Sequence, residues 1–216
     1  MLHPAKLWHY ETLGRKAVEA LKRNNFDAAY VADSAEACET ILAQIPEGAT
    51  LGFGGSMTLQ AIGLFERLKA GPYHPINPPW NEGSLSREER TALRRQALMA
   101  DVFLTGTNAV TLDGKLVNTD ATANRVAAML FGPKKTIVAV GVNKIVRTLD
   151  DALDRVANVA SPANARRLAL DTPCATTGEC SDCRSSQRIC NATVILHKKP
   201  IGLSFGVVMI GEELGF

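Results

Sequence analysis

Four cysteines near the carboxyl end of the chain have the residue type and the spacing of a metal centre. Their spacing is C-x5-C-x2-C-x6-C, and they are Cys174, Cys180, Cys183 and Cys190. The residues between them are polar or small, so residues 172–190 cannot bury a core of their own and something else must order them. Four thiolates that meet at one metal would do so, and an x2 gap lets two sulfurs of one turn reach the same ion.

Three interpretations of this quartet stay open from the residues alone. The first is a 4Fe-4S cluster, which takes four cysteine thiolates, although the gaps here are wider than those of the common bacterial ferredoxin run. The second is a structural zinc site with four cysteine ligands. The third is a set of disulfides or unliganded thiols. We expect a metal, with iron–sulfur slightly ahead of zinc, because clustered cysteines of reduced compartments are more often metal sites than disulfides.

A glycine-rich turn offers a second kind of chemistry. Gly54, Gly55, Ser56 and Thr58 stand between a predicted strand and a predicted helix. Such a turn can aim free backbone N–H groups at an anion, with a hydroxyl added by Ser56 or Thr58. An equally good alternative is a tight turn in which Ser56 is the helix N-cap.

Further polar residues follow the next predicted strands. They are Thr107, Asn108, Asp120, Asn124, Asn143 and Lys144. Ligands of open α/β sheets bind at the carboxyl ends of the strands. We therefore expect Lys144 to offer a point charge to a phosphate or carboxylate and Asp120 to act as a hydroxyl acceptor or general base. An ordinary turn role explains any one of these residues better, but the set favours a pocket for a small polar or anionic molecule.

Alternating helices and strands must position these residues. Apolar periodicity and capping residues predict helices over 4–24, 34–44, 56–69, 86–99, 123–131 and 148–162, with 164–170 continuing as helix. Ser86 with Glu89 and Thr148 with Asp151 have the spacing of capping boxes at the start of two of these helices. Short apolar runs predict strands over 28–32, 50–53, 101–105, 135–140, 192–197 and 203–210. Asp113 and Gly114 predict a hairpin of 109–112 with 115–118. Residues 70–85 hold four prolines, which predicts a long loop whose aromatic residues line a pocket or pack on the core.

The composition is typical of one α/β domain over residues 1–216. The chain has 216 residues, of which 46% are hydrophobic, enough for one sizeable core. Its 24 basic and 22 acidic residues give a net charge of +2, which favours neither nucleic acid nor an anionic membrane as a partner. The amino-terminal stretch shows no apolar signal core, and the apolar run 207–210 is too short to span a bilayer. We expect a cytoplasmic protein without a membrane span.

Seven blocks of sequence are similar to a known family. They are residues 52–59, 104–111, 116–118, 124–127, 132–135, 140–144 and 172–190. In these blocks the chain resembles the LUD-domain (lactate utilisation) proteins. The resemblance implies an α/β, Rossmann-like three-layer fold similar to the ribose-5-phosphate isomerase/CoA-transferase superfamily, with the cysteine-rich segment as a metal-binding insertion. Family members are associated with oxidation of lactate to pyruvate beside iron–sulfur partners, which moves iron–sulfur further ahead of zinc.

Three functional hypotheses follow. In the first, a cluster on the cysteine quartet passes electrons to or from a redox partner protein or a bound small organic anion. In the second, the chain is an isomerase- or transferase-like enzyme for a phosphate- or CoA-type ligand, with zinc as a structural staple. In the third, the cluster senses oxygen or redox state. Isomerases of the implied fold carry an acid in the turn that corresponds to 106–108, and this chain has none there. The substrate and the oligomeric state stay open.

Overall fold

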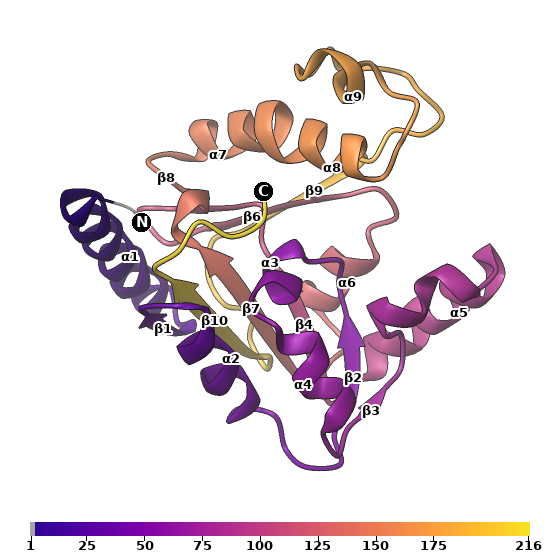
Figure 1. The fold of residues 1–216 in the computed structure, drawn as a ribbon, viewed down its shortest axis with the longest axis horizontal. Helices are drawn as coiled ribbons and strands as arrows, with labels where there is room; N and C mark the ends of the chain where they lie inside the picture. The colour runs from indigo at the N-terminus through magenta and orange to yellow at the C-terminus, as the bar shows by residue number, and fades with distance from the viewer. Residues whose placement is uncertain (1–2) are drawn as a thin grey trace.

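The computed structural model describes residues 3–216, so Met1 and Leu2, part of the stretch without a signal core, lie outside the described residues. A six-stranded sheet, sheet A, crosses the molecule (Figure 1) in the order β1-β10-β7-β4-β2-β3. All its pairings are parallel. Its strands are β1 (Asp27–Val31), β2 (Thr50–Phe53), β3 (His74–Pro75), β4 (Val102–Gly106), β7 (Lys135–Gly141) and β10 (Ser204–Ile210).

Helices cover one face of sheet A. They are α2 (Ser34–Leu42), α3 (Met57–Ala61) and α4 (Leu64–Ala70). Their apolar side chains, among them Ile41 and Leu59, pack against strand residues such as Leu104 and Ile137. The predicted single helix over 56–69 is wrong in one respect, because Gly63 adopts a left-handed φ of 72° that separates α3 from α4.

The other face of sheet A carries α1 (Pro4–Arg23), α6 (Asn124–Leu130) and a second, smaller sheet. Side chains alternate between the two faces along a strand. In β7, Ile137 packs with the helices of the first face, whereas Val138 packs with Leu21 of α1 and Met129 of α6. Sheet A is therefore buried on both sides, which explains why its strands have nearly continuous apolar sequences.

The second sheet, sheet B, has the strand order β8-β5-β6-β9. Its strands are β8 (Ile145–Val146), β5 (Ala109–Thr111), β6 (Leu116–Asp120) and β9 (Ala192–Leu196). The predicted hairpin is confirmed, because β5 and β6 pair antiparallel. The strands predicted over 192–197 and 203–210 join different sheets. The first is β9 at the edge of sheet B, and the second is β10, which lies in sheet A between β1 and β7.

A long helical segment covers the outer face of sheet B. It begins with α7 (Leu149–Arg155), passes through a π-helical turn, η4 (Val156–Ala160), and ends with α8 (Ser161–Arg167). Ala152 and Val156 pack on the sheet. Helix continues past Pro162, as predicted for 164–170, because Pro162 lies in the first turn of α8, where a missing N–H costs no hydrogen bond.

Residues 70–85 form the predicted connection, in which short β3 and the 3-10 turn η1 (Pro79–Ser84) interrupt the loop. Trp80 places its ring 5.6 Å from that of Phe53 and 5.8 Å from that of Phe65, so it is partly buried against the core. The predicted capping box of Ser86 then begins α5 (Arg87–Gln96), and η2 (Ala97–Met99) follows.

The remaining elements are η3 (Val142–Lys144) and α9 (Pro173–Thr177). These layers confirm the predicted α/β three-layer fold with a parallel central sheet. Within residues 3–216, no helix combines the length and the apolar character that a membrane crossing requires.

Candidate functional site

A pocket with a volume of about 290 Å³ opens where neighbouring strands of sheet A end. One wall comes from the turns after β2 and β4 and from η3 after β7, and α8 forms the opposite wall. This is the edge at which ligands of parallel α/β sheets bind. The lining residues include Gly55, Ser56, Met57, Thr107, Asn108, Asp120, Asn124, Arg125, Lys144, Ser161, Asn164, Arg167 and Phe216.

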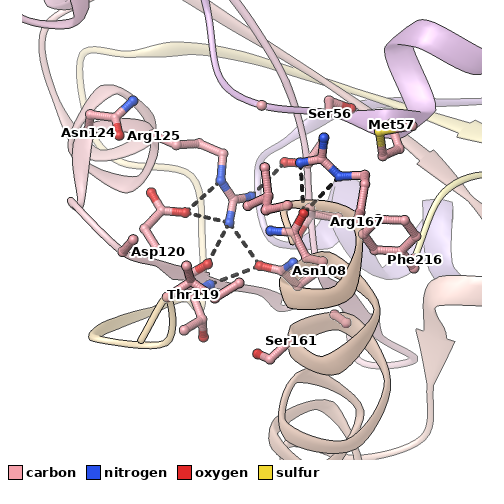
Figure 2. Close-up of a pocket in the computed structure, with 18 of the residues that line it drawn as sticks. Ser56, Met57, Asn108, Thr119, Asp120, Asn124, Arg125, Ser161, Arg167 and Phe216 are labelled. Atoms are coloured by element: carbon pink, nitrogen blue, oxygen red, sulfur yellow. Dashed lines mark hydrogen bonds and ion pairs between the residues drawn. The ribbon is translucent and has the colours of Figure 1, made fainter. Parts of the chain in front are cut away.

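A buried ion pair between Arg125 and Asp120 lies at the base of the pocket (Figure 2). Arg125 Nε donates to Asp120 Oδ1 over 2.8 Å, and Nη2 lies 2.7 Å from the same oxygen. The other carboxylate oxygen, Oδ2, accepts the backbone N–H of Val126 at 2.9 Å. Asp120 therefore uses both of its oxygens to hold the start of α6. Its predicted role as a general base stays a prediction.

The remaining donors of Arg125 join β6 to the turn after β4. Nη1 donates to the carbonyl of Gly106 over 3.1 Å and to Asn118 Oδ1 over 2.6 Å. Nη2 donates to Asn108 Oδ1 over 2.8 Å and to the carbonyl of Thr119 over 3.0 Å. All five guanidinium N–H groups are thus engaged by the protein, which makes Arg125 a positioning residue.

Two glycines leave room for side chains that pack closely against the turns after β2 and β4. A Cβ at Gly54 would lie 2.8 Å from Cγ of Arg125 and 2.6 Å from Oγ1 of Thr105. A Cβ at Gly106 would lie 2.8 Å from Oγ of Ser56. Both separations are shorter than packed atoms tolerate, so the two turns need glycine for steric reasons, whatever the ligand.

Lys144 is a buried cation whose side chain reaches the pocket. The residue is 4% exposed, and its Nζ donates to Oγ1 of Thr58 over 3.1 Å. Within residues 3–216 it forms no ion pair. Burial first, and then the nearby charges of Arg155 and Arg125, lower the pKa of Lys144 from 10.5 to about 7. Desolvation thus leaves the amine near the midpoint of its titration at neutral pH.

Arg155 connects the turn after β4 to the turn after β7. Its Nη1 donates to the carbonyl of Asn108 over 2.7 Å, and its Nε donates to the carbonyl of Asn143 over 3.3 Å. Burial lowers the pKa of its guanidinium. Arg155 therefore fixes the ends of the β4 and β7 turns relative to each other and adds positive charge beside Lys144.

The charges that line the pocket do not balance. Its two acidic side chains are already paired, Glu82 with Arg94 at 3.0 Å and Asp120 with Arg125. Arg167 donates from Nε and Nη2 to the neutral Oδ1 of Asn164, over 3.0 and 2.8 Å. Among the described lining residues, Lys144 and Arg167 are left without a carboxylate partner. The pocket is therefore suited to an anion.

The structure brings most of the predicted ligand-binding residues to this pocket. Gly55, Ser56, Thr107, Asn108, Asn124 and Lys144 line it, as Asp120 does. Ser56 is also the N-cap of α3, because its Oγ accepts the N–H of Leu59 at 3.2 Å. Thr107 uses its hydroxyl within the protein, on the carbonyls of Ala109 and Val117.

Gly54, Thr58 and Asn143 are not among the lining residues. Asn143 binds the carboxyl-terminal segment instead. Its Nδ2 donates to the carbonyl of Gly215 over 3.0 Å, and its Oδ1 accepts the N–H of Leu214 at 3.1 Å. Thr58 is fully buried behind Lys144 and donates to the carbonyl of Leu214 over 3.2 Å. These residues therefore support the pocket wall rather than form it.

Several residues of the site were not predicted. Arg125, Arg155 and the α8 residues Ser161, Asn164 and Arg167 had no role in the sequence-based prediction. One sequence signal could have found Arg125: it is a charged residue among apolar helix residues such as Val126 and Ala128, which are buried. A buried arginine needs partners, so its position predicts an ion pair. No local pattern marks Arg167 as a pocket residue, because its neighbour Arg166 has the same chemistry.

The cysteine segment lies beside the pocket and carries free thiols. None of the five cysteines of the described chain is in a disulfide. Burial raises the pKa of the Cys190 thiol; Arg188 opposes this, and the charges of Cys180 and Cys183 add to it. Within residues 3–216, no three or more His, Cys, Asp or Glu side chains are gathered as a metal site. Four free thiols on one exposed segment fit a metal by their chemistry, but they do not converge here.

Two contacts connect this segment to the pocket. Ile189, next to Cys190, lines the pocket. The backbone N–H of Asn191 donates to the carbonyl of Asp120 over 3.1 Å. The end of the cysteine segment is thus held against the strand that carries the buried ion pair.

Comparisons with known proteins agree with this architecture. A family model described as the LUD domain matches residues 14–209. A crystal structure of a DUF162 family protein from Deinococcus radiodurans is similar, with a TM-score of 0.51 and 16% identity, over 97% of this chain and 99% of that one. This similarity supports the fold. No match was found among the curated proteins.

Two weaker structural similarities carry no functional weight. The eIF2B delta structure from Chaetomium thermophilum matches with a TM-score of 0.38 and 19% identity, over 56% of this chain and 50% of that one. The eIF2B beta structure from the same organism matches with a TM-score of 0.38 and 17% identity, over 55% and 44%.

Proposed function

The chain belongs to the LUD-domain family, that of lactate utilisation, and from this premise we propose that its pocket binds a small organic anion, as a component of lactate or related organic-acid oxidation. The charge imbalance of the pocket carries the proposal. Lys144 and Arg167 have no carboxylate partner among the described lining residues, whereas Glu82 and Asp120 are paired. An anion in the pocket would supply the missing negative charge beside the buried amine of Lys144, where solvent screens it little.

The polar groups of the pocket suit a carboxylate that carries a second oxygen function. Arg167 has a planar guanidinium, which matches carboxylate geometry. The Oδ1 of Asn108 is held by Arg125 and by the N–H of Thr119 at 2.9 Å, which fixes the direction of its amide N–H groups. We expect that amide to donate to a hydroxyl or carbonyl oxygen of the ligand. Groups held in this way bind without a large ordering cost.

We also propose that Cys174, Cys180, Cys183 and Cys190 hold a 4Fe-4S cluster. The proximity of Ile189 and Asn191 to the pocket supports this role, because a redox centre on the segment would lie beside the bound acid. When bound, the cluster would supply electron transfer to a redox partner protein. The proposal includes a cytoplasmic location, where thiols stay reduced. Structural zinc is the alternative metal.

The alternative function is an isomerase- or transferase-like activity on a phosphate- or CoA-type ligand. The same two cations favour it, because ammonium and guanidinium groups also bind phosphate. The site offers less for the reaction itself. The turn after β4 has no carboxylate, and Asp120 already uses both oxygens on Arg125 and Val126.

A ligand panel tests the proposal. Thermal shift and calorimetry of the native protein with lactate, pyruvate, inorganic phosphate and CoA should show binding of a small carboxylate. Arg167→Gln should weaken that binding at least tenfold, because a hydrogen bond to a charged group contributes about 1.5–3 kcal/mol. Arg166→Gln is the matched control, since Arg166 is an exposed arginine of the same helix, as Arg167 is, but does not line the pocket.

Two results would count against the proposal. Failure of every anion to bind the native protein would remove it, and so would equal losses in the Arg167 and Arg166 variants. Tight binding of phosphate or CoA with no binding of carboxylates would select the alternative function.

A further inference from the structure

The side chain of Lys144 combines two properties that surface lysines lack. It is almost fully buried, and the residue nevertheless lines a pocket large enough for a small molecule. No carboxylate within residues 3–216 pairs with it to hold a proton on the amine. A lysine that is desolvated and beside other cations is the kind that acts as a nucleophile toward carbonyl compounds.

We propose that Nζ of Lys144 forms an imine with the carbonyl carbon of a 2-oxo acid bound in the pocket. This inference rests on the proposed binding of a small organic anion and narrows its class. A 2-oxo acid carries a carboxylate for Arg167 and, on the adjacent carbon, an electrophilic carbonyl for Lys144. Both residues line the same pocket.

The surroundings of the amine hold it in position for this reaction. The Thr58 hydroxyl donates to the carbonyl of Leu214, so its oxygen is free to accept an N–H of Lys144 at 3.1 Å. The backbone of Gly215 lies on the same side of the amine as Thr58, since a Cβ at Gly215 would lie 3.3 Å from Nζ of Lys144. One N–H is thus directed into the protein.

The positive charges behind the amine keep part of its population neutral. Burial is the largest cause that disfavours a proton on Lys144, and the charges of Arg155 and Arg125 add to it. Both guanidinium groups are tied to backbone carbonyls of the surrounding turns, so they stay beside the amine. A neutral amine at neutral pH is the reactive form.

The reaction balances without an oxidant or a reductant. The lone pair of Nζ forms a bond to the carbonyl carbon, and the π electrons of the carbonyl move to its oxygen, which takes a proton. That proton replaces one that the amine loses, and the carbinolamine then loses its hydroxyl group together with the second amine proton as water as the C=N bond forms. One amine and one carbonyl give one imine and one water.

Reductive trapping tests the inference. Native protein is incubated with pyruvate and sodium cyanoborohydride, and intact mass spectrometry should show one reduced pyruvate unit per chain, which peptide mapping places on Lys144. Lactate has no carbonyl and should bind without leaving an adduct. Lys144→Arg should abolish the adduct, whereas Lys198→Arg, at an exposed lysine, should keep it.

The readouts separate this inference from the binding proposal. Pyruvate that shifts the melting temperature of the native protein without modifying Lys144 overturns the imine and leaves anion binding intact. If pyruvate neither binds nor forms an adduct, both the imine and the binding proposal are overturned. An adduct spread over many lysines, unchanged in Lys144→Arg, also overturns the imine, and mapping on the native protein decides the matter even where that variant does not fold.

Discussion

Arg125 and Asp120 form an ion pair in which Nη2 and Oδ1 are 2.7 Å apart and both side chains are only 9% exposed. Every guanidinium N–H of Arg125 is used within the protein, and both oxygens of Asp120 are used as well. The pair therefore builds the pocket floor by joining α6, β6 and the turn after β4. A ligand meets the groups that this pair positions.

Removing Arg125 should destabilise the fold severely. Arg125→Met leaves Asp120 buried without its counter-ion, and loss of one partner of a buried pair costs about 3–5 kcal/mol. Urea unfolding followed by circular dichroism measures the free energy of unfolding. Arg87→Met, at an exposed position of α5, is the control and should change it little. The double variant Arg125→Met/Asp120→Asn should recover part of the loss, and a near-native Arg125→Met would contradict the assigned role.

The buried amine of Lys144 should make stability depend on pH. Its pKa is about 7 in the folded chain and 10.5 ordinarily, so between those values the unfolded chain binds a proton that the folded chain does not. The free energy of unfolding should therefore rise with pH across this window. Lys144→Met lacks this group and should be more stable than the native chain at pH 6.

The native and Lys144→Met proteins are best compared at pH 6 and pH 9.5. The amount by which the free energy of unfolding of Lys144→Met exceeds that of the native protein should shrink by about 3 kcal/mol from pH 6 to pH 9.5, since one pKa unit corresponds to about 1.4 kcal/mol. Lys198→Met, at an exposed lysine, should run parallel to the native protein. If the free energy of unfolding of Lys144→Met changed with pH as that of the native protein does, the buried amine would not be titrating in this window.

Anion binding should be coupled to proton uptake. A ligand without a carbonyl, such as lactate, favours the ammonium form of Lys144, so binding should raise its pKa from about 7. At pH 8 the binding enthalpy should differ between HEPES and Tris buffers, and at pH 6, where the amine already carries its proton, the difference should vanish. Affinity should fall by up to about tenfold per pH unit above 7. Equal enthalpies in both buffers at pH 8 would speak against the coupling.

The metal proposal depends on one cysteine segment and not on the fifth cysteine. Protein purified without oxygen should contain iron and absorb visible light, and Cys190→Ser should lose most of both. Cys38→Ser is the matched control, because Cys38 belongs to α2, where it is buried in the core, far in sequence from the quartet. Colourless protein with stoichiometric zinc would replace iron–sulfur with the structural alternative, and metal-free protein would remove the centre.

The sequence by itself determined the local helices, strands and turns. It also indicated that the pocket lies at the edge where the parallel strands have their carboxyl ends. The capping boxes of Ser86 and Thr148 form as predicted, as does the β5–β6 hairpin at Asp113 and Gly114. These features follow from interactions within a few residues, which periodicity and turn chemistry report directly. The glycine turn after β2 and Lys144 after β7 were found for the same reason, since parallel strands bring their carboxyl ends to one edge.

Only the tertiary structure decided which side chains meet there. Asn143 turns to the carboxyl-terminal segment, whereas Arg167 reaches the pocket from a helix that covers sheet B. The partners of Arg125 lie on two strands and a turn, and β9 and β10 enter different sheets although they adjoin in sequence. Burial and pairing of charges over such separations depend on how the layers pack, and no local pattern of residues encodes that packing.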